Sequence, residues 1–547
     1  METILLAVAG VVLIAVASVI APRIGTAAPL VLLAAGIVVS VLPFTPDYEI
    51  DPELILAGLL PPLLYSAAVN MPAMDFRRDF RAISGLSVLL VVISALTLGG
   101  VFTWLIDDLD YPLAVALGAI VSPTDAVATS IVRRLGVSSR IVTILEGESM
   151  LNDATALVLL RSAVAATAAG VSLGGVLADF VWAVVAAVAI GWIIGEGVLR
   201  LRGLIPDPAV STALSFTVPF LAYLPAEEVG ASGLVAAVTA GLVTGHGQVS
   251  RLGPGQRFSD RQNWRTAELI LEGVVFLVMG LQLSALVRDV EEAHEGTGWA
   301  FVYAVVALVV VLGIRALYVA VIVLAEKRRQ RRAPGLRETI DEWSSRVERS
   351  THPRADRLRT RLRRVAADVD FFDASQVGRR HGLVLVWAGL RGAVTLAAAQ
   401  TLPVDAPGRS QLVLIAFFVA LLSLVVQGGT LGPLVRVLGL GGVPDTDEQE
   451  WRRLNACMRE VGNEVLERAD LPEPWRQAGE RLRSRTTQDE VDLGPLRQVR
   501  RDVIVAQRER LLRERADGTF SSAALSRMLA QLDADEIGLE MRGPAGA

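Results

Sequence analysis

A series of long apolar stretches recurs along the first 440 residues and constrains this chain more than any other feature. Most of them are long enough for a helix to cross the roughly 30 Å hydrocarbon layer of a membrane. A backbone in lipid must satisfy its own hydrogen bonds, so these stretches predict transmembrane helices. They lie near residues 3–21, 27–43, 53–70, 82–106, 112–134, 141–168, 176–200, 209–224, 229–247, 264–287, 299–325, 380–402 and 409–438. We therefore expect an all-α polytopic membrane protein with about thirteen spans.

The composition agrees with this prediction and narrows the chemistry. The chain is 52% hydrophobic and its mean hydropathy is +0.49, which is too apolar for a soluble protein of 547 residues. A single cysteine, Cys457, excludes a disulfide framework and a zinc ribbon, and the four histidines show no metal-ligand spacing. The chemistry must rest on carboxylates and arginines. We expect neither an enzymatic activity nor a cofactor.

The loop charges test the number of spans, because short cytoplasmic loops carry an excess of Lys and Arg. One alternating set of loops is basic and holds Arg23, Arg77, Arg78, Arg81, Arg133, Arg134, Arg140, Arg200, Arg202, Arg251, Arg257, Arg261, Arg265 and the Arg-rich run 327–380. The other set is acidic and holds Asp47, Glu49, Asp51, Asp107, Asp108, Asp110, Glu227, Glu228, Asp289, Glu291, Glu292 and Glu295. This alternation predicts a plasma membrane protein with its N-terminus outside and its C-terminus in the cytoplasm.

Two polar segments fall outside the predicted spans. Residues 326–379 form a basic cytoplasmic insertion in the membrane domain, 1–440, and residues 441–547 form a charged tail. The insertion is either a solvated helical loop or a surface that binds anionic lipid. The tail has helical spacing around Trp451–Leu466 and Ala523–Leu532, and it lacks catalytic motifs. We expect a helical tail with a regulatory or assembly role.

Ionisable side chains inside transmembrane helices are costly, so they are the candidate functional residues. The candidates chosen from the predicted spans are Asp125, Glu146, Glu148, Asp153, Arg161, Glu196, Glu268, Glu272, Arg315 and Arg391. Arg161, Glu196, Glu268 and Glu272 lie nearer the predicted span ends and are interpreted as interfacial or structural.

Asp125 lies in the interior of the fifth predicted span, directly after Pro123 and Thr124. Pro123 lacks a backbone N–H, so the helix is expected to break here and expose carbonyl groups that suit a hard cation. The alternative is a proline kink in which Asp125 only caps the freed backbone. At 1.5 Å per residue Asp125 is about 20 Å deep, which favours an ion path.

The sixth predicted span carries polar residues on one helix face. Ser149, Asn152 and Asp153 are spaced i, i+3 and i+4, so their oxygens share that face. Asp153 is about 18 Å from the inner end of its helix, which places it near the depth of Asp125.

Two arginines complete the set of buried charges. Arg315 lies about 15 Å from the inner end of its helix and Glu148 about 10 Å, so we expect them to form a structural ion pair. Arg391 lies mid-span between glycines and supplies a permanent positive charge near the carboxylates. The alternative interpretation of Arg391 is an arginine whose head group reaches the membrane interface, but its position in the middle of the span argues against this.

Three runs, Thr124–Asp125, Glu148–Asp153 and Gly389–Gly392, together resemble the monovalent cation:proton antiporter-1 family of sodium/proton exchangers. The order and spacing of the runs also agree, and the resemblance covers about residues 3–440. It implies inverted repeats, two broken helices that cross at mid-membrane, a mobile core and a dimerisation domain.

The resemblance also implies a role for each matching residue. Asp125 and Asp153 would be Na⁺ ligands, with Ser149 and the Thr124 backbone beside them. Asn152 would tie the broken helix to the site, Glu148 would pair with Arg315, and Arg391 would hold the second broken helix. One position departs from the family pattern. Many members carry an acid after the aromatic residue of the third helix, but here Tyr65 is followed by Ser66, which puts an accessory acidic ligand in doubt.

These observations predict a secondary active antiporter for monovalent cation transport and pH homeostasis. A proton and a dehydrated Na⁺, Li⁺ or K⁺ would compete for the buried carboxylates, because desolvation favours their protonated form. The expected partners are membrane lipid, the cation, the proton and a second copy of the chain, and not nucleic acid. A cation channel or uniporter is the main alternative. An intramembrane aspartyl protease is a third, but Arg391 nearby fits it poorly.

Overall fold

The computed structural model describes residues 2–42, 51–168, 173–294, 296–348, 355–442, 448–469 and 494–541. Three predicted loop charges, Asp47, Glu49 and Glu295, lie outside the described residues. The chain divides into two compact units: Met1–Lys327 with Val377–Val443, and Arg328–Gln376 with Pro444–Ala547.

The first unit is helical, and every predicted span corresponds to a helix or to consecutive helices. The helices are α1 (Glu2–Ile20), α2 (Ala28–Ser40), α3 (Leu60–Asn70), α4 (Ala73–Ser84), α5 (Leu90–Leu105), α6 (Tyr111–Val121), α7 (Val127–Arg134), α8 (Ser139–Ala168), α9 (Leu173–Gly203), α10 (Pro208–Glu228), α11 (Gly233–Arg251), α12 (Pro254–Leu281), α13 (Leu283–Glu292), α14 (Thr297–Glu348, shared with the second unit), α16 (Arg379–Trp387), α17 (Ala393–Gln400), α18 (Arg409–Leu422) and α19 (Gly429–Val437). Three π-helical segments, η1 (Leu54–Leu59), η2 (Gly85–Leu89) and η3 (Ser423–Gly428), lie within the spans.

The lengths of these helices agree with a membrane protein of about thirteen spans. In the described part of the chain, six continuous helical stretches are long and apolar enough to cross a membrane by themselves. Shorter apolar helices, among them Ala28–Ser40 and Tyr111–Val121, add to them. The predicted all-α polytopic fold is confirmed.

Two spans are interrupted near their middle. The first breaks between α6 and α7 at residues 122–126, where Pro123 removes a backbone donor, and the second breaks between α16 and α17 at residues 388–392. The two breaks meet, because the Asp125 N–H donates to the Leu390 carbonyl at 2.7 Å. The prediction that broken helices cross at their interruptions is confirmed.

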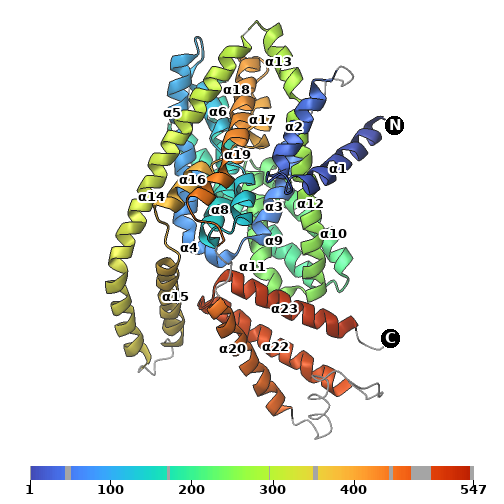
Figure 1. The fold of residues 1–547 in the computed structure, drawn as a ribbon, viewed down its shortest axis with the longest axis vertical. Coiled ribbons are helices and arrows are strands. Elements are labelled where there is room, and N and C mark those ends of the chain that lie inside the picture. Colours follow the sequence, from blue (N-terminus) through green and yellow to red (C-terminus); the bar gives the residue numbers. More distant parts are fainter. Residues whose placement is uncertain are drawn as a thin grey trace. The chain divides into compact units, whose positions relative to one another are not determined.

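The crossing lies in a tightly packed part of the first unit. Every residue of α6 from Leu113 to Val121 is buried, and α6 contacts α5, α8, α17 and α18. Figure 1 shows the short helices α16 and α17 beside α8 and α6. A second apolar cluster joins α3, α8, α9, α10 and α11 and includes Trp264 of α12.

The second unit joins the polar insertion to the C-terminal tail. It contains the end of α14, α15 (Ala355–Ala374), α20 (Glu448–Arg468), α22 (Gly494–Asp517) and α23 (Ser522–Met541). Arg364 of α15 donates to the Ala516 carbonyl of α22 at 2.6 Å, and Arg508 of α22 pairs with Asp533 of α23 at 3.1 Å. The helices predicted around Trp451–Leu466 and Ala523–Leu532 correspond to α20 and α23.

Candidate ion-binding site

The candidate site is centred on the break between α6 and α7. Thr124 is buried there, Asp125 is partly exposed, and the next residue, Ala126, is exposed. The Asp125 carboxylate accepts one backbone N–H, from Val127, at 3.3 Å. The break after Pro123 therefore leaves backbone groups outside the helical hydrogen bonds and places a carboxylate beside them. In a continuous helix those groups would have been used in its own hydrogen bonds.

The polar face of α8 lies against this break. Asn152 Nδ2 donates to the Thr124 carbonyl at 3.2 Å and to Thr124 Oγ1 at 2.7 Å. These bonds fix the orientation of the amide, and they leave Asn152 Oδ1 without a hydrogen-bond donor among the described residues although the residue is 1% exposed. An unsatisfied buried oxygen is costly, so this atom indicates that a ligand or water is needed there.

Asp153 lies on the same face of α8 and interacts electrostatically with Asp125. Both Asp153 and Ser149 are buried. In the part of the chain that the structure describes, the Asp153 carboxylate has neither a hydrogen bond nor an ion pair. Carboxylate, hydroxyl and amide oxygens thus gather around the break. Oxygens of this kind are the preferred ligands of hard cations.

Glu148 lies beside this set and is neutralised by an arginine. Arg315 of α14 donates through both terminal nitrogens to the Glu148 carboxylate, with Nη2 at 2.8 Å from Oε2, and through Nε to the Leu385 carbonyl at 2.8 Å. Thr124 Oγ1 adds a hydrogen bond to Glu148 Oε1 at 3.0 Å. Glu148 and Arg315 are each 1% exposed, so they form a buried ion pair in which both carboxylate oxygens accept from the guanidinium.

Arg391 binds backbone rather than an acid. Its Nε donates to the Val121 carbonyl at the end of α6 at 3.2 Å, and its Nη1 donates to the Gly389 carbonyl. Its own N–H donates to Ser423 Oγ at 2.8 Å. The guanidinium therefore satisfies carbonyls that both helix breaks leave free, and it places a fixed positive charge at the crossing.

Gly392 of the second break lies directly against Asp125 of the first. A Cβ atom at this position would overlap the Asp125 carboxylate. The backbone of the second break can approach Asp125 only because residue 392 has no side chain.

Glu268 and Glu272 lie farther from the start of their helix than sequence reasoning placed them. The predicted span began at residue 264, which put both near its end, but α12 begins at Pro254. Ser66 Oγ donates to Glu268 Oε1 at 2.5 Å, and Glu272 interacts electrostatically with both Asp125 and Glu268. The signal that could have revealed them is the four-residue spacing of Asp260, Trp264, Glu268 and Glu272.

The remaining ionisable candidates lie away from the crossing. Arg161 is an exposed residue that pairs with Glu227 at 2.8 Å, and Glu196 pairs with Arg200 and Arg251 at 2.9 and 2.6 Å. Glu146 pairs with Arg133, whose side chain is exposed. Among the described residues, no group of three or more His, Cys, Asp or Glu could hold a metal ion.

Comparison with known proteins agrees with this geometry. The family model described as "Sodium/hydrogen exchanger, transmembrane" matches residues 9–437. The chain belongs to this family. The sodium/hydrogen exchanger match includes both broken helices, α8, α12 and the first part of α14, and it ends before the tail.

Individual relatives cover different shares of this exchanger. An uncharacterized Na(+)/H(+) exchanger, YjcE, of Escherichia coli is 36% identical over 284 residues, which are 49% of this chain and 50% of that protein. The Na(+)/H(+) antiporter NhaH of Halobacillus aidingensis is 28% identical over 72% of this chain and 85% of its own. The solved structure of the sodium proton antiporter MjNhaP1 from Methanocaldococcus jannaschii has the same fold, with a TM-score of 0.57, 17% identity, and coverage of 81% and 99% of the two chains.

Proposed function

We propose that this membrane protein exchanges protons for Na⁺, or for Li⁺ or K⁺, by competition of proton and cation for Asp125 and Asp153. The observation that supports the proposal is that Asp125 lies where two broken helices cross and interacts electrostatically with Asp153, while Glu148 nearby is already neutralised by Arg315. The names of the Na(+)/H(+) antiporter relatives support the same reading.

Each residue has a proposed role. Asp125 and Asp153 bind the cation or the proton, and Ser149 with the Thr124 backbone supplies further oxygens. Asn152 orients the first break through Thr124, and its free Oδ1 faces the ligand. Glu148 with Arg315 and, separately, Arg391 position the helices. The exchanger is assigned to residues 1–440 and a regulatory or assembly role to 441–547.

Exchange follows from occupancy of one site. An empty site leaves uncompensated negative charge in a low-dielectric interior, which opposes its movement through the membrane. A bound proton or a bound cation removes one unit of that charge, so the loaded core can move more readily than the empty core. The proposal includes a homodimer in the plasma membrane, with the N-terminus outside and the arginine-rich loops in the cytoplasm, in line with the positive-inside rule.

The test is transport by the purified full-length protein in liposomes that contain a pH-sensitive dye. An imposed proton gradient should collapse when Na⁺, Li⁺ or K⁺ is added outside, in proportion to the preference for each cation. Choline at equal ionic strength and protein-free liposomes are the controls. Cation flux without coupled proton movement would instead identify a channel or uniporter.

We expect the exchange to be electroneutral. Asn152 stands beside Asp153 and cannot carry a proton, and Arg391 keeps its charge in contact with backbone carbonyls. If Asp153 titrates while Asp125 stays ionised, one proton leaves for each cation that binds. Sodium-driven proton flux measured with the membrane potential clamped by potassium and valinomycin should therefore not change with potential, after a control that excludes potassium transport.

A steep dependence of that flux on potential would contradict one-for-one exchange. One net charge per cycle corresponds to about 2.3 kcal/mol for every 100 mV, so the difference is readily measured.

A further inference from the structure

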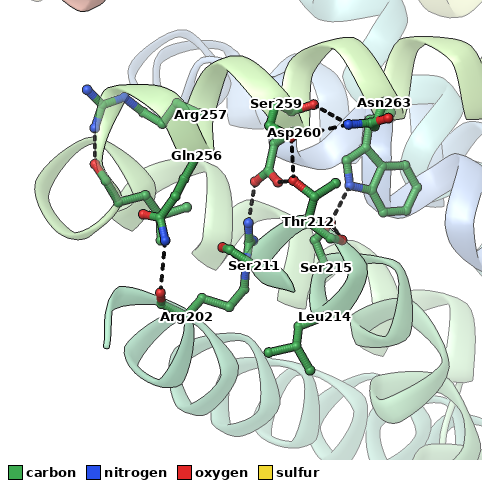
Figure 2. A network of polar contacts seen from close by, with 12 residues as sticks. Arg202, Ser211, Thr212, Leu214, Ser215, Gln256, Arg257, Ser259, Asp260 and Asn263 are labelled. Atoms are coloured by element: carbon green, nitrogen blue, oxygen red, sulfur yellow. Dashed lines mark hydrogen bonds and ion pairs between the residues drawn. The ribbon is translucent and has the colours of Figure 1, made fainter. Parts of the chain in front are cut away.

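The face of α12 that carries Asp260, Trp264, Glu268 and Glu272 repeats every four residues over about 18 Å of helix. Its first member is fully neutralised. Asp260 pairs with Arg202 of α9 and accepts from Thr212 Oγ1 of α10 at 2.8 Å, as Figure 2 shows. Arg202 is 1% exposed and also donates to Ser211 Oγ at 3.1 Å. Asp260 is therefore a structural acid that has no charge left to offer a cation.

The second member joins α12 to α3. Trp264 Nε1 donates to Ser215 Oγ at 2.9 Å, and its ring packs on Tyr65 with 5.2 Å between ring centroids. This contact fixes α3 and α12 relative to each other one turn before Glu268. The Ser66 hydroxyl, next to Tyr65 in α3, is thereby placed where it can donate to the Glu268 carboxylate at 2.5 Å.

Glu268 and Glu272 differ from Asp260 in their electrostatics. Within the described chain neither forms an ion pair, and Ser66 is the side chain that hydrogen-bonds Glu268. The arginines that act on Glu268 at longer range are Arg133 and Arg265, and Arg134 acts on Glu272. Both acids are partly exposed, as Asp125 is. Glu272 thus interacts electrostatically with both Glu268 and Asp125, so the three acids form a series that ends at the crossing. At the crossing, Asn152 Oδ1 has no hydrogen-bond donor among the described residues, which separately indicates a ligand.

We propose that Glu268, held by Ser66, is an accessory carboxylate of the exchange pathway that attracts the transported monovalent cation and passes it by way of Glu272 to Asp125. The acid expected on α3 is replaced by Ser66, and the facing helix α12 returns a carboxylate to the same place through the Ser66 hydroxyl. The inference rests on the proposed exchange and concerns how the cation reaches the site, since Glu268 itself lies outside the crossing.

A charge with this role has a defined kinetic effect. A carboxylate without an ion pair in surroundings of low dielectric raises the local concentration of cations. Removing its charge should therefore lower the apparent affinity for the cation more than it lowers the maximal rate of exchange. We expect Glu268→Gln to raise the Na⁺ concentration for half-maximal exchange by roughly three- to tenfold, with little change in maximal rate. The shift should shrink when ionic strength is raised with choline chloride, because salt screens the lost charge.

The experiment compares wild type, Glu268→Gln, the exchanged pair Ser66→Asp/Glu268→Gln, and Glu228→Gln as a matched control. Glu228 is an exposed glutamate at the end of α10, so it undergoes the same chemical change away from the pathway. Two readouts are taken on the full-length protein: Na⁺-dependent exchange in liposomes, and the Na⁺ concentration that gives half of the rise in Tm in detergent, which reports binding without turnover. The exchanged pair should regain most of the wild-type affinity, because it returns one acid to the same contact.

Two results would overturn the role of Glu268. One is a Glu268→Gln protein with wild-type Na⁺ midpoints, and the other is a protein with lower Tm and lower maximal rate but unchanged midpoints, which would make Glu268 structural. A wild-type protein that binds Na⁺ in the Tm assay yet exchanges no protons would overturn the proposed exchange, while the Tm midpoints would still decide about Glu268. No response to Na⁺, Li⁺ or K⁺ in either assay would overturn both.

Discussion

Asp153→Asn and Asp125→Asn are each expected to reduce cation-coupled proton movement by at least roughly 100-fold, equal to about 3 kcal/mol, while the protein still inserts and folds. Asparagine keeps the shape of aspartate but can neither bind a proton nor neutralise a cation. Asp153 has no ion pair in the described chain, and the Asp125 carboxylate is held by backbone N–H groups such as that of Val127 at 3.3 Å, which an asparagine oxygen can also accept, so little stability depends on either charge. The measurement is dye recovery in liposomes after addition of each cation.

The control for these variants is Asp405→Asn, the same change at an exposed position in the segment between α17 and α18. Size-exclusion profiles and Tm values of all three variants should match wild type. Normal exchange by Asp125→Asn or Asp153→Asn would remove that residue from the ion site. Loss of exchange together with loss of a folded elution peak would mean that the carboxylate stabilises the fold instead.

Arg315→Ala or Glu148→Ala is expected to destabilise the protein by about 3–5 kcal/mol, because each change strands a charge that is 1% exposed. Arg315 also satisfies the Leu385 carbonyl, and Glu148 also accepts from Thr124, so each single variant leaves further polar groups unpaired. The double variant should lose less than the sum of the two single losses. Thermal unfolding of the four proteins measures the effect.

Arg161→Ala is the matched control for this pair, since it breaks an ion pair whose arginine side chain is 58% exposed. Exposed pairs contribute about 0–1 kcal/mol, so its Tm should stay close to wild type. If Glu148→Ala kept its Tm and lost Na⁺ binding, Glu148 would be a cation ligand and the ion pair with Arg315 would not be its main role.

Much of the membrane architecture could be predicted from the sequence because lipid imposes simple rules. Apolar length and alternating loop charge predict the spans, and Pro123 predicts the break in the fifth of them. Helical rise alone placed Asp125 and Asp153 at similar depth. Their roles stay predictions until they are tested by substitution.

Other features could not be predicted because they depend on long-range packing. The first two turns of α12 contain Arg257 and Asp260, which read as loop by hydropathy, yet they are buried through contacts with Leu252 and with Arg202. The Ser66–Glu268 hydrogen bond joins residues 202 positions apart. Likewise nothing in the local pattern of the insertion indicated that α15 packs on α22 of the tail. The partners of these polar residues are distant in the sequence, so hydropathy along the chain does not show that the residues are buried.

The bond between the Asp125 N–H and the Leu390 carbonyl has a consequence for how this protein can change over evolutionary time. Both partners are backbone groups, so side-chain substitutions cannot delete the bond, except proline at residue 125. The crossing of the two broken helices is therefore held by a contact that tolerates changes in the surrounding side chains.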